Sequence, residues 1–178
     1  CLNAAFVLVR IDVFRDLSSA VERAAKLSIG GALASSVKAY AFYVRGEAFR
    51  CNGQFDLAVE CYGASLAASQ AIPVSDRVQT VLSLAVAHSR LGQPDTGLQA
   101  IGEALTLLQH DKGQISLALR TRVLLEAAAI AVAAGQNEEA LTFLISVHAL
   151  LDKKHRKRRE WPVVAQIAMA MQSAAKGR

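Results

Sequence analysis

The most informative part of the chain is residues 42–62, FYVRGEAFRCNGQFDLAVECY. Gly46 lies four positions after the large Phe42, and the aromatic Phe49 follows three positions later. Gly53 then permits the left-handed backbone angle that ends a helix, and apolar residues resume two positions later at Phe55. Because small residues let helix axes approach closely, this stretch predicts two helices packed as a hairpin.

The same arrangement recurs twice downstream. The turn glycines of the three copies are Gly53, Gly92 and Gly135. Ala85 and Ala128 occupy the small position of the first helix in the second and third copies. A degenerate copy fits upstream, with Arg15 where the turn glycine is expected. A single hairpin leaves an apolar face open until a neighbour covers it, so repeated hairpins predict a stack.

This pattern resembles the tetratricopeptide repeat (TPR) family over residues 5–151. The family's usual period is about 34 residues, whereas the turn glycines here are 39 and 43 residues apart. Longer repeats of this kind are similar to those in the sensor arms of bacterial LuxR-type regulators and in eukaryotic scaffold subunits. The resemblance implies an all-α fold of stacked antiparallel helical hairpins, which form a right-handed superhelix closed by a terminal capping helix.

We expect one domain over residues 1–178, because no Gly-, Ser- or Pro-rich linker divides the chain. It would comprise a degenerate repeat at about 3–30, repeats at about 34–70, 75–109 and 115–151, and the capping helix at about 161–175. The expected helices lie near 3–14, 17–29, 34–52, 55–70, 75–91, 94–109, 115–134, 137–152 and 161–175. Ser75 and Asp76 are predicted to cap the helix that begins at 75.

The net charge of +5 is concentrated near the end of the sequence. The basic run comprises Lys153, Lys154, Arg156, Lys157, Arg158 and Arg159. A solvated linker between two helices is the favoured interpretation of this run. An acidic protein partner and a phosphate contact with nucleic acid are the alternatives. Base stacking is poorly supported, because Trp161 is the nearest aromatic residue and none is interleaved with the cations.

No catalytic or metal-binding pattern is found in the sequence. A phosphate-binding GxxxxGK[ST] motif is missing, and the four histidines are dispersed. Cys1, Cys51 and Cys61 form no CxxC pair, which argues against a zinc site or a disulfide framework. We therefore expect a non-catalytic protein without a cofactor. The apolar runs are too short to span a membrane, and a cytoplasmic location is expected, or a nuclear one if the protein is eukaryotic.

In the TPR family, ligands usually lie on the concave side formed by the first helix of each pair. The resemblance implies that this groove is lined here by Tyr40, Tyr43, Glu47, Arg50, Gln79, Leu82, Arg90, Arg122 and Glu126, with Val86, Ser89, Leu125 and Ala129 beside them. We expect Tyr43 and Arg50 to be the strongest contacts, since aromatic and Arg side chains dominate interface energies. The alternative is that Tyr40 and Tyr43 pack against the neighbouring hairpin.

The family's carboxylate clamp, which grips the carboxyl terminus of chaperone tails, requires Lys and Asn at set groove positions. Tyr43 stands where the Lys belongs, and Glu47 stands where the first Asn belongs. A carboxylate at that place would repel the ligand, so we expect no chaperone-tail binding and a less charged or mixed partner.

Two functions fit these features. The leading hypothesis is a scaffold that binds a peptide or a protein subunit in its groove. The alternative is a regulatory sensor arm of a larger transcription regulator or signalling protein, which would bind a small effector or form a homo-oligomer.

Overall fold

The computed structural model describes residues 32–68, 73–110, 113 and 115–150, and this part of the chain is helical without strands. Its helices are α2 (Ala32–Cys51), α3 (Phe55–Ala68), α4 (Val74–Arg90), α5 (Pro94–His110), α6 (Leu117–Ala133) and α7 (Asn137–Leu150). These bounds agree with the helices expected from the sequence to within two residues at each end. The expected helices at 3–14, 17–29 and 161–175 and the basic run lie outside the described residues.

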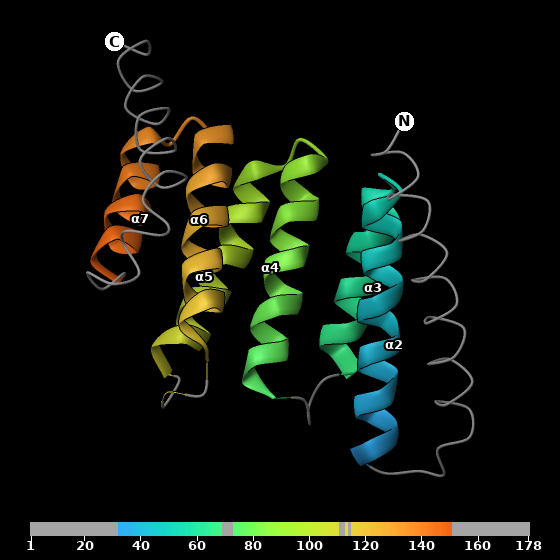
Figure 1. Cartoon of the computed structure of the whole chain (residues 1–178). Coiled ribbons are helices and arrows are strands. Elements are labelled where there is room, and N and C mark those ends of the chain that lie inside the picture. Colours follow the sequence, from blue (N-terminus) through green and yellow to red (C-terminus); the bar gives the residue numbers. More distant parts are fainter. Residues whose placement is uncertain (1–31, 69–72, 111–112, 114, 151–178) are drawn as a thin grey trace, which may run out of the picture.

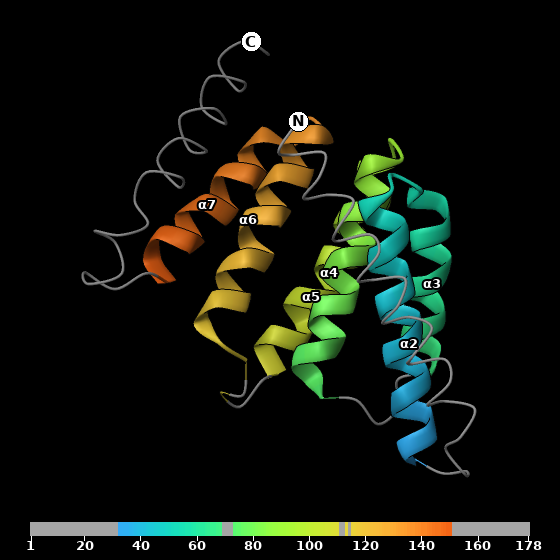
Figure 2. The same cartoon turned by 45° about the vertical axis from the view of Figure 1, so that its right-hand side comes forward.

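Consecutive helices pair as three antiparallel hairpins, α2–α3, α4–α5 and α6–α7. The hairpins stack side by side in sequence order (Figures 1 and 2). The predicted all-α stack of hairpins is therefore confirmed for the described residues.

The three hairpins turn in the same way. Gly53, Gly92 and Gly135 have φ angles of 74°, 76° and 75°. After each of these glycines, a backbone N–H reaches back to a carbonyl five residues earlier, as in the 3.0 Å bond from Gln54 to Phe49. This is the Schellman arrangement, in which a left-handed residue satisfies the last carbonyls of a helix. The turn glycines thus have the role that the repeat pattern predicts.

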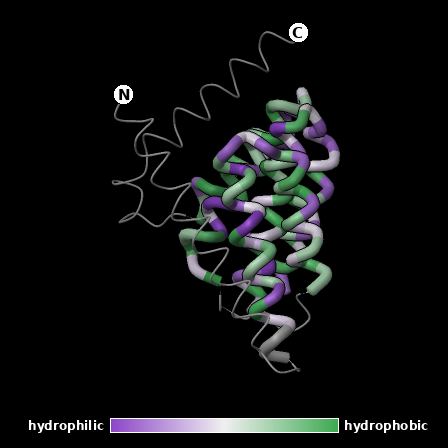
Figure 3. The backbone as a smooth tube through the Cα atoms, turned by 90° about the vertical axis from the view of Figure 1, so that its right-hand side faces the viewer, coloured by the Kyte–Doolittle hydropathy of each residue, from purple (hydrophilic) through white to green (hydrophobic). Residues whose placement is uncertain are grey.

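Small residues bring the two helices of each hairpin together. A Cβ atom on Gly97 of α5 would lie 2.9 Å from the Ala85 carbonyl oxygen of α4, so this crossing leaves no room for a side chain. Ala58 and Ala140, near the starts of α3 and α7, have no exposed surface. Apolar and polar stretches alternate along the helices (Figure 3), as is typical of helices with one buried face.

The largest core cluster lies in the middle of the stack. It contains Val78, Val81, Leu82, Ala85, Ile101, Ala104, Leu108, Ile115, Val123, Ala127 and Ile130. These residues come from α4, α5 and α6 and the segment before α6. The core therefore joins the second hairpin to the third.

The predicted cap at Ser75 and Asp76 is wrong. Helix α4 already begins at Val74, its N-cap residue is Pro73, and no side chain caps it. Asp76 instead lies in the first turn, where its charge favours the helix dipole. Helix α6, in contrast, has a side-chain cap, because the Ser116 hydroxyl accepts a 3.2 Å hydrogen bond from the Leu119 N–H.

The first helices of the hairpins, α2, α4 and α6, form an inner layer, and the second helices, α3, α5 and α7, form an outer layer. Helix α4 contacts both α2 and α6, while among the described helices no comparable contacts join α3 to α5 or α5 to α7. In Figure 1, α4 and α6 lie in front of α5. The inner helices thus contact one another directly, whereas α3 and α5 contact the next hairpin through α4 and α6. None of the described helices is long and apolar enough to cross a membrane.

Candidate functional site

All nine residues predicted to line the groove lie on the helices of the inner layer, and they differ in exposure. Tyr40 is 52% exposed. Arg90 and Arg122 are also exposed, whereas Gln79 and Glu126 are half-buried. These five side chains are accessible from solvent on α2, α4 and α6. That they bind a partner stays a prediction.

Tyr43 joins the first hairpin to the second. Its hydroxyl accepts a 2.9 Å hydrogen bond from Nε2 of Gln79, across the α2–α4 boundary. Burial raises the pKa of Tyr43, and the nearby Glu47 carboxylate raises it further. Tyr43 therefore packs against the neighbouring hairpin, as the alternative interpretation states, and its half-buried ring also faces the inner layer.

Glu47 and Arg50 satisfy each other within α2. Nη2 of Arg50 donates to Oε2 of Glu47 at 2.7 Å, and the Tyr62 hydroxyl donates to Oε1 of Glu47 at 2.6 Å. Burial opposes the charged form of Glu47, but the hydrogen bonds from Arg50 and Tyr62 outweigh it and lower the pKa of the carboxyl. Glu47 is 9% exposed. The pair is a largely internal contact, so Arg50 is less available to a partner than its position in the repeat implies.

Leu82 is a correction to the predicted groove. Its side chain has no exposed surface and lies in the core cluster with Val78 and Ile101. A fully buried side chain cannot touch a partner, so Leu82 is a packing residue.

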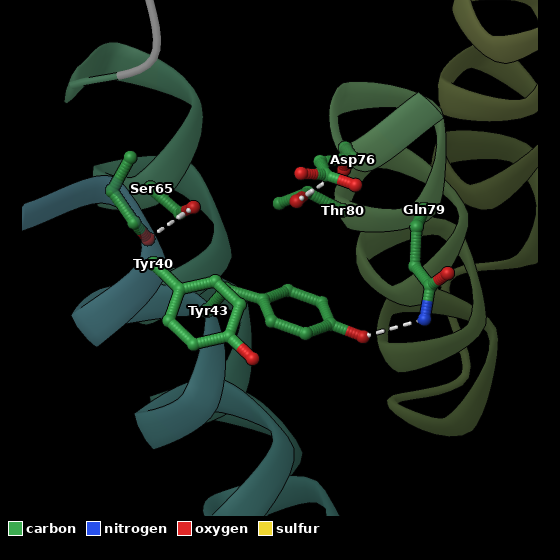
Figure 4. A pocket seen from close by; sticks show the side chains of 7 residues that line it. Tyr40, Tyr43, Ser65, Asp76, Gln79 and Thr80 are labelled. Atoms are coloured by element: carbon green, nitrogen blue, oxygen red, sulfur yellow. Dashed lines mark hydrogen bonds between the residues drawn. The ribbon is translucent and has the colours of Figure 1, made fainter. Parts of the chain in front are cut away.

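A cavity of about 230 Å³ opens between the first and second hairpins. It is lined by Ala39, Tyr40 and Tyr43 of α2, Ser65 of α3, and Asp76, Gln79 and Thr80 of α4. We call it the tyrosine pocket. Figure 4 shows the two tyrosine rings on the α2 side and Asp76 on the α4 side. Tyr40, Tyr43 and Gln79 were predicted to line the groove, and the structure places these three together.

Sequence reasoning missed Ala39, Ser65, Asp76 and Thr80 as lining residues. Asp76 precedes Gln79 by three positions, so both lie on one side of α4. That spacing is a signal available in the sequence. Ser65 gives no such signal, because it reaches the pocket only through the packing of α3 against α2, where its hydroxyl donates to the Ala39 carbonyl at 2.7 Å.

The two layers differ in charge. The inner helices carry seven Lys or Arg and three Asp or Glu. The outer helices carry six Asp or Glu and neither Lys nor Arg. All six outer acids are exposed. The accessible cations of the described stack therefore belong to its inner layer.

The described residues bring no group of three or more His, Cys, Asp or Glu side chains into an arrangement that could hold a metal ion.

Solved structures with the same architecture include TPR and TPR-like proteins. The first TPR domain of human RPAP3 superposes with a TM-score of 0.61 at 18% identity, over 78% of this chain and 94% of that domain. A kinesin light chain with TPR-like repeats from Podosopora anserina gives a TM-score of 0.65 at 19% identity, over 96% of this chain and 87% of its own. The chain has a TPR-like fold. Its helical-repeat fold class, predicted from the turn glycines, is thereby confirmed.

Comparison by sequence finds no matching family model and no matching curated protein. The TPR-like likeness thus rests on structure at low identity and describes the fold. The finer resemblance to the sensor arms of LuxR-type regulators stays a prediction.

Proposed function

We propose that this chain is a non-catalytic interaction module that binds a peptide or protein segment along its inner layer. The observation that carries the proposal is the layer itself. The three first helices lie next to one another in the stack, and they hold an exposed tyrosine, two exposed arginines and an open pocket. Tyr and Arg are the residue types most enriched at the energetic centres of interfaces.

The charge of the inner layer narrows the partner. Arg90 and Arg122 are exposed and form no ion pair within the described residues. A partner segment with acidic residues would pair with them, whereas the acidic outer layer would repel it. Glu126 adds one negative charge to the inner layer, so a mixed sequence fits better than a uniformly acidic one.

The test reverses the two exposed cations in an Arg90→Glu/Arg122→Glu variant. The full chain and the variant would each capture proteins from nuclease-treated native extract, followed by quantitative mass spectrometry. We expect at least one partner captured by the full chain to fall roughly tenfold with the variant, because charge reversal replaces attraction with repulsion.

The matched control is Glu60→Lys/Glu139→Lys, which reverses two exposed charges on the outer helices α3 and α7. Circular dichroism would establish that both variants keep their helical content. Equal capture by all three proteins would contradict binding along the inner layer. Loss of the partner only with the control variant would place the binding surface on the outer layer.

The alternative function, a regulatory sensor or oligomerisation arm, stays a prediction, as do the cytoplasmic location and the single-domain organisation. The sequence of the full-length gene tests the sensor reading, because an adjacent nucleotide-binding or DNA-binding domain would support it.

A further inference from the structure

Three of the four hydroxyl groups that line the tyrosine pocket have hydrogen-bond partners among the described residues. Tyr43 accepts from Gln79 at 2.9 Å, and the Thr80 hydroxyl donates to the Asp76 carbonyl at 2.9 Å. Ser65 donates to the Ala39 carbonyl. These three hydroxyl groups are therefore less available to a ligand than the Asp76 carboxylate is.

Asp76 is the charged residue of the lining. Its carboxylate accepts a long 3.4 Å bond from the neighbouring Ser75 hydroxyl. A carboxylate offers about four lone-pair sites, so this single bond leaves capacity for a further donor. Neither salt bridge of the described residues involves Asp76. Its negative charge thus remains available at the mouth of the pocket.

The opposite wall is aromatic. The rings of Tyr40 and Tyr43 have centroids 6.3 Å apart and are tilted by 34°. Tyr40 leaves half of its surface to solvent. The face of an aromatic ring attracts a cation within about 6 Å. A cation that enters the pocket would therefore lie between the tyrosine rings of α2 and the Asp76 carboxylate of α4, which Figure 4 shows on opposite sides of the pocket.

The size of the pocket fits a single side chain. Its volume of about 230 Å³ is below the range of about 300–1,000 Å³ for pockets that hold drug-sized ligands. The positive charge of Arg122 on α6 slightly opposes the rise in the pKa of Tyr43. Arg122 is not part of the lining. None of the seven lining residues is a Lys or Arg.

We propose that the tyrosine pocket binds the Arg or Lys side chain of the partner protein, between the tyrosine rings and the Asp76 carboxylate. The proposal rests on the proposed function, since the pocket opens on the same inner layer. The pocket also sets the direction in which the partner segment lies along the inner layer. The partner segment places a basic residue at the boundary of the first two hairpins and acidic residues near Arg90 and Arg122.

The test uses a minimal probe, the capped peptide acetyl-Gly-Arg-Gly-amide, titrated into the full ¹⁵N-labelled chain. Acetyl-Gly-citrulline-Gly-amide is the matched neutral probe, because citrulline keeps the shape of Arg and lacks its charge. We expect saturable amide shifts at Tyr40, Asp76 and Gln79 with the Arg peptide and much weaker ones with the citrulline peptide.

Two matched variants complete the test. Asp76→Asn should raise the dissociation constant of the Arg peptide by about threefold to tenfold, as loss of a charge-assisted bond at an exposed site implies. Asp95→Asn removes another exposed acid from the first turn of α5, and Asp95 is not among the lining residues. This variant should leave the constant unchanged.

Equal shifts with the two peptides, equal weakening by the two variants, or no saturable shift would each overturn the inference. These outcomes are separate from the proposed function, which depends on Arg90 and Arg122. If capture of a partner is lost with the arginine variant but unaffected by Asp76→Asn, binding along the inner layer is supported and binding of a cation in the tyrosine pocket is contradicted.

Discussion

At the scale of single residues, the buried Glu47 carboxylate is the most consequential polar group in the first hairpin. It holds Arg50 of its own helix and Tyr62 of the next one through hydrogen bonds of 2.7 and 2.6 Å. Tyr62 has no exposed surface, and burial together with the Glu47 carboxylate raises its pKa. The same carboxylate holds the Arg50 guanidinium in its charged form and raises its pKa. A negative charge at position 47 therefore links α2 to α3.

The lowered pKa of Glu47 predicts a pH dependence of stability. A carboxyl whose pKa is lower in the folded state stabilises the fold above its unfolded pKa, about 4.3 for Glu, and this contribution is lost as the pH falls through the folded pKa. Glu47→Gln should therefore be less stable than the wild type at pH 7 and should lose less stability below about pH 4. Urea unfolding from pH 7 to pH 3 measures both effects.

Glu60→Gln is the control for this experiment, because Glu60 is exposed on α3. It should reproduce the wild-type pH profile. A Glu47→Gln profile parallel to that of the wild type would show that the buried carboxylate contributes nothing specific.

Gly46 gives a second test at this scale. A Cβ atom there would lie 2.7 and 2.8 Å from Cε1 and Cδ1 of the Tyr62 ring. The ring is buried and held by Glu47, so it cannot move aside cheaply. Gly46→Ala should therefore destabilise the chain by about 1–3 kcal/mol, as overpacking does, despite the better helix propensity of Ala.

Gly63 of α3 is the matched control, because the same change to Ala should alter the stability of the chain in the opposite direction. It is exposed, and nothing lies within 4 Å of its virtual Cβ. Gly63→Ala should stabilise the chain by about 0.5–1 kcal/mol. Urea midpoints that move the same way in the two variants would contradict the close packing of Gly46 on Tyr62.

At the scale of elements, the starts of α4 and α6 show two ways to begin a helix. The Ser116 hydroxyl accepts from the Leu119 N–H at α6, while α4 begins after Pro73 with no side-chain cap. Ser116→Ala should cost about 1 kcal/mol. Ser75→Ala should change stability by less than about 0.5 kcal/mol, since Ser75 lies within the first turn of α4 and bonds only to Asp76 among the described contacts.

Thermal or urea unfolding of the two serine variants decides this prediction. A loss at Ser75 as large as that at Ser116 would restore the cap that the sequence suggested for α4.

The helices themselves were predictable because their signals are local. Turn glycines at 53, 92 and 135 end the first helix of each pair, and all three adopt the left-handed angle. The start of α4 was not predictable in the same way, because Pro73 and Ser75 both suit the first positions of a helix. Propensity does not choose between neighbouring residues at such a boundary.

The candidate site was predictable only in part, because it depends on contacts between hairpins. The repeat position of Tyr40, Tyr43 and Gln79 placed them on the inner side of the helices. It also placed Leu82 there, yet Leu82 is covered completely. Likewise, repeat position marks Arg50 as a contact but cannot reveal that Glu47 already holds it. Tertiary packing decides the exposure of a residue within a repeat position.

At the scale of the whole molecule, the inner and outer layers of helices present surfaces of different charge and shape. The outer layer is acidic and covers the core, and the inner layer carries the exposed cations and the tyrosine pocket. A curved stack of hairpins presents one long surface rather than a single closed cavity. This architecture suits an extended partner segment, and it makes the choice of layer the central claim.

Site-specific photo-crosslinking tests the choice of layer most directly. A photoreactive amino acid would replace Tyr40 or Ala129, both exposed on inner helices, or Gln99 or Thr142, both exposed on outer helices. After irradiation in native extract, we expect one partner protein to crosslink from both inner positions and from neither outer one. Crosslinks to that partner from Gln99 and Thr142, with none from Tyr40 and Ala129, would contradict binding along the inner layer.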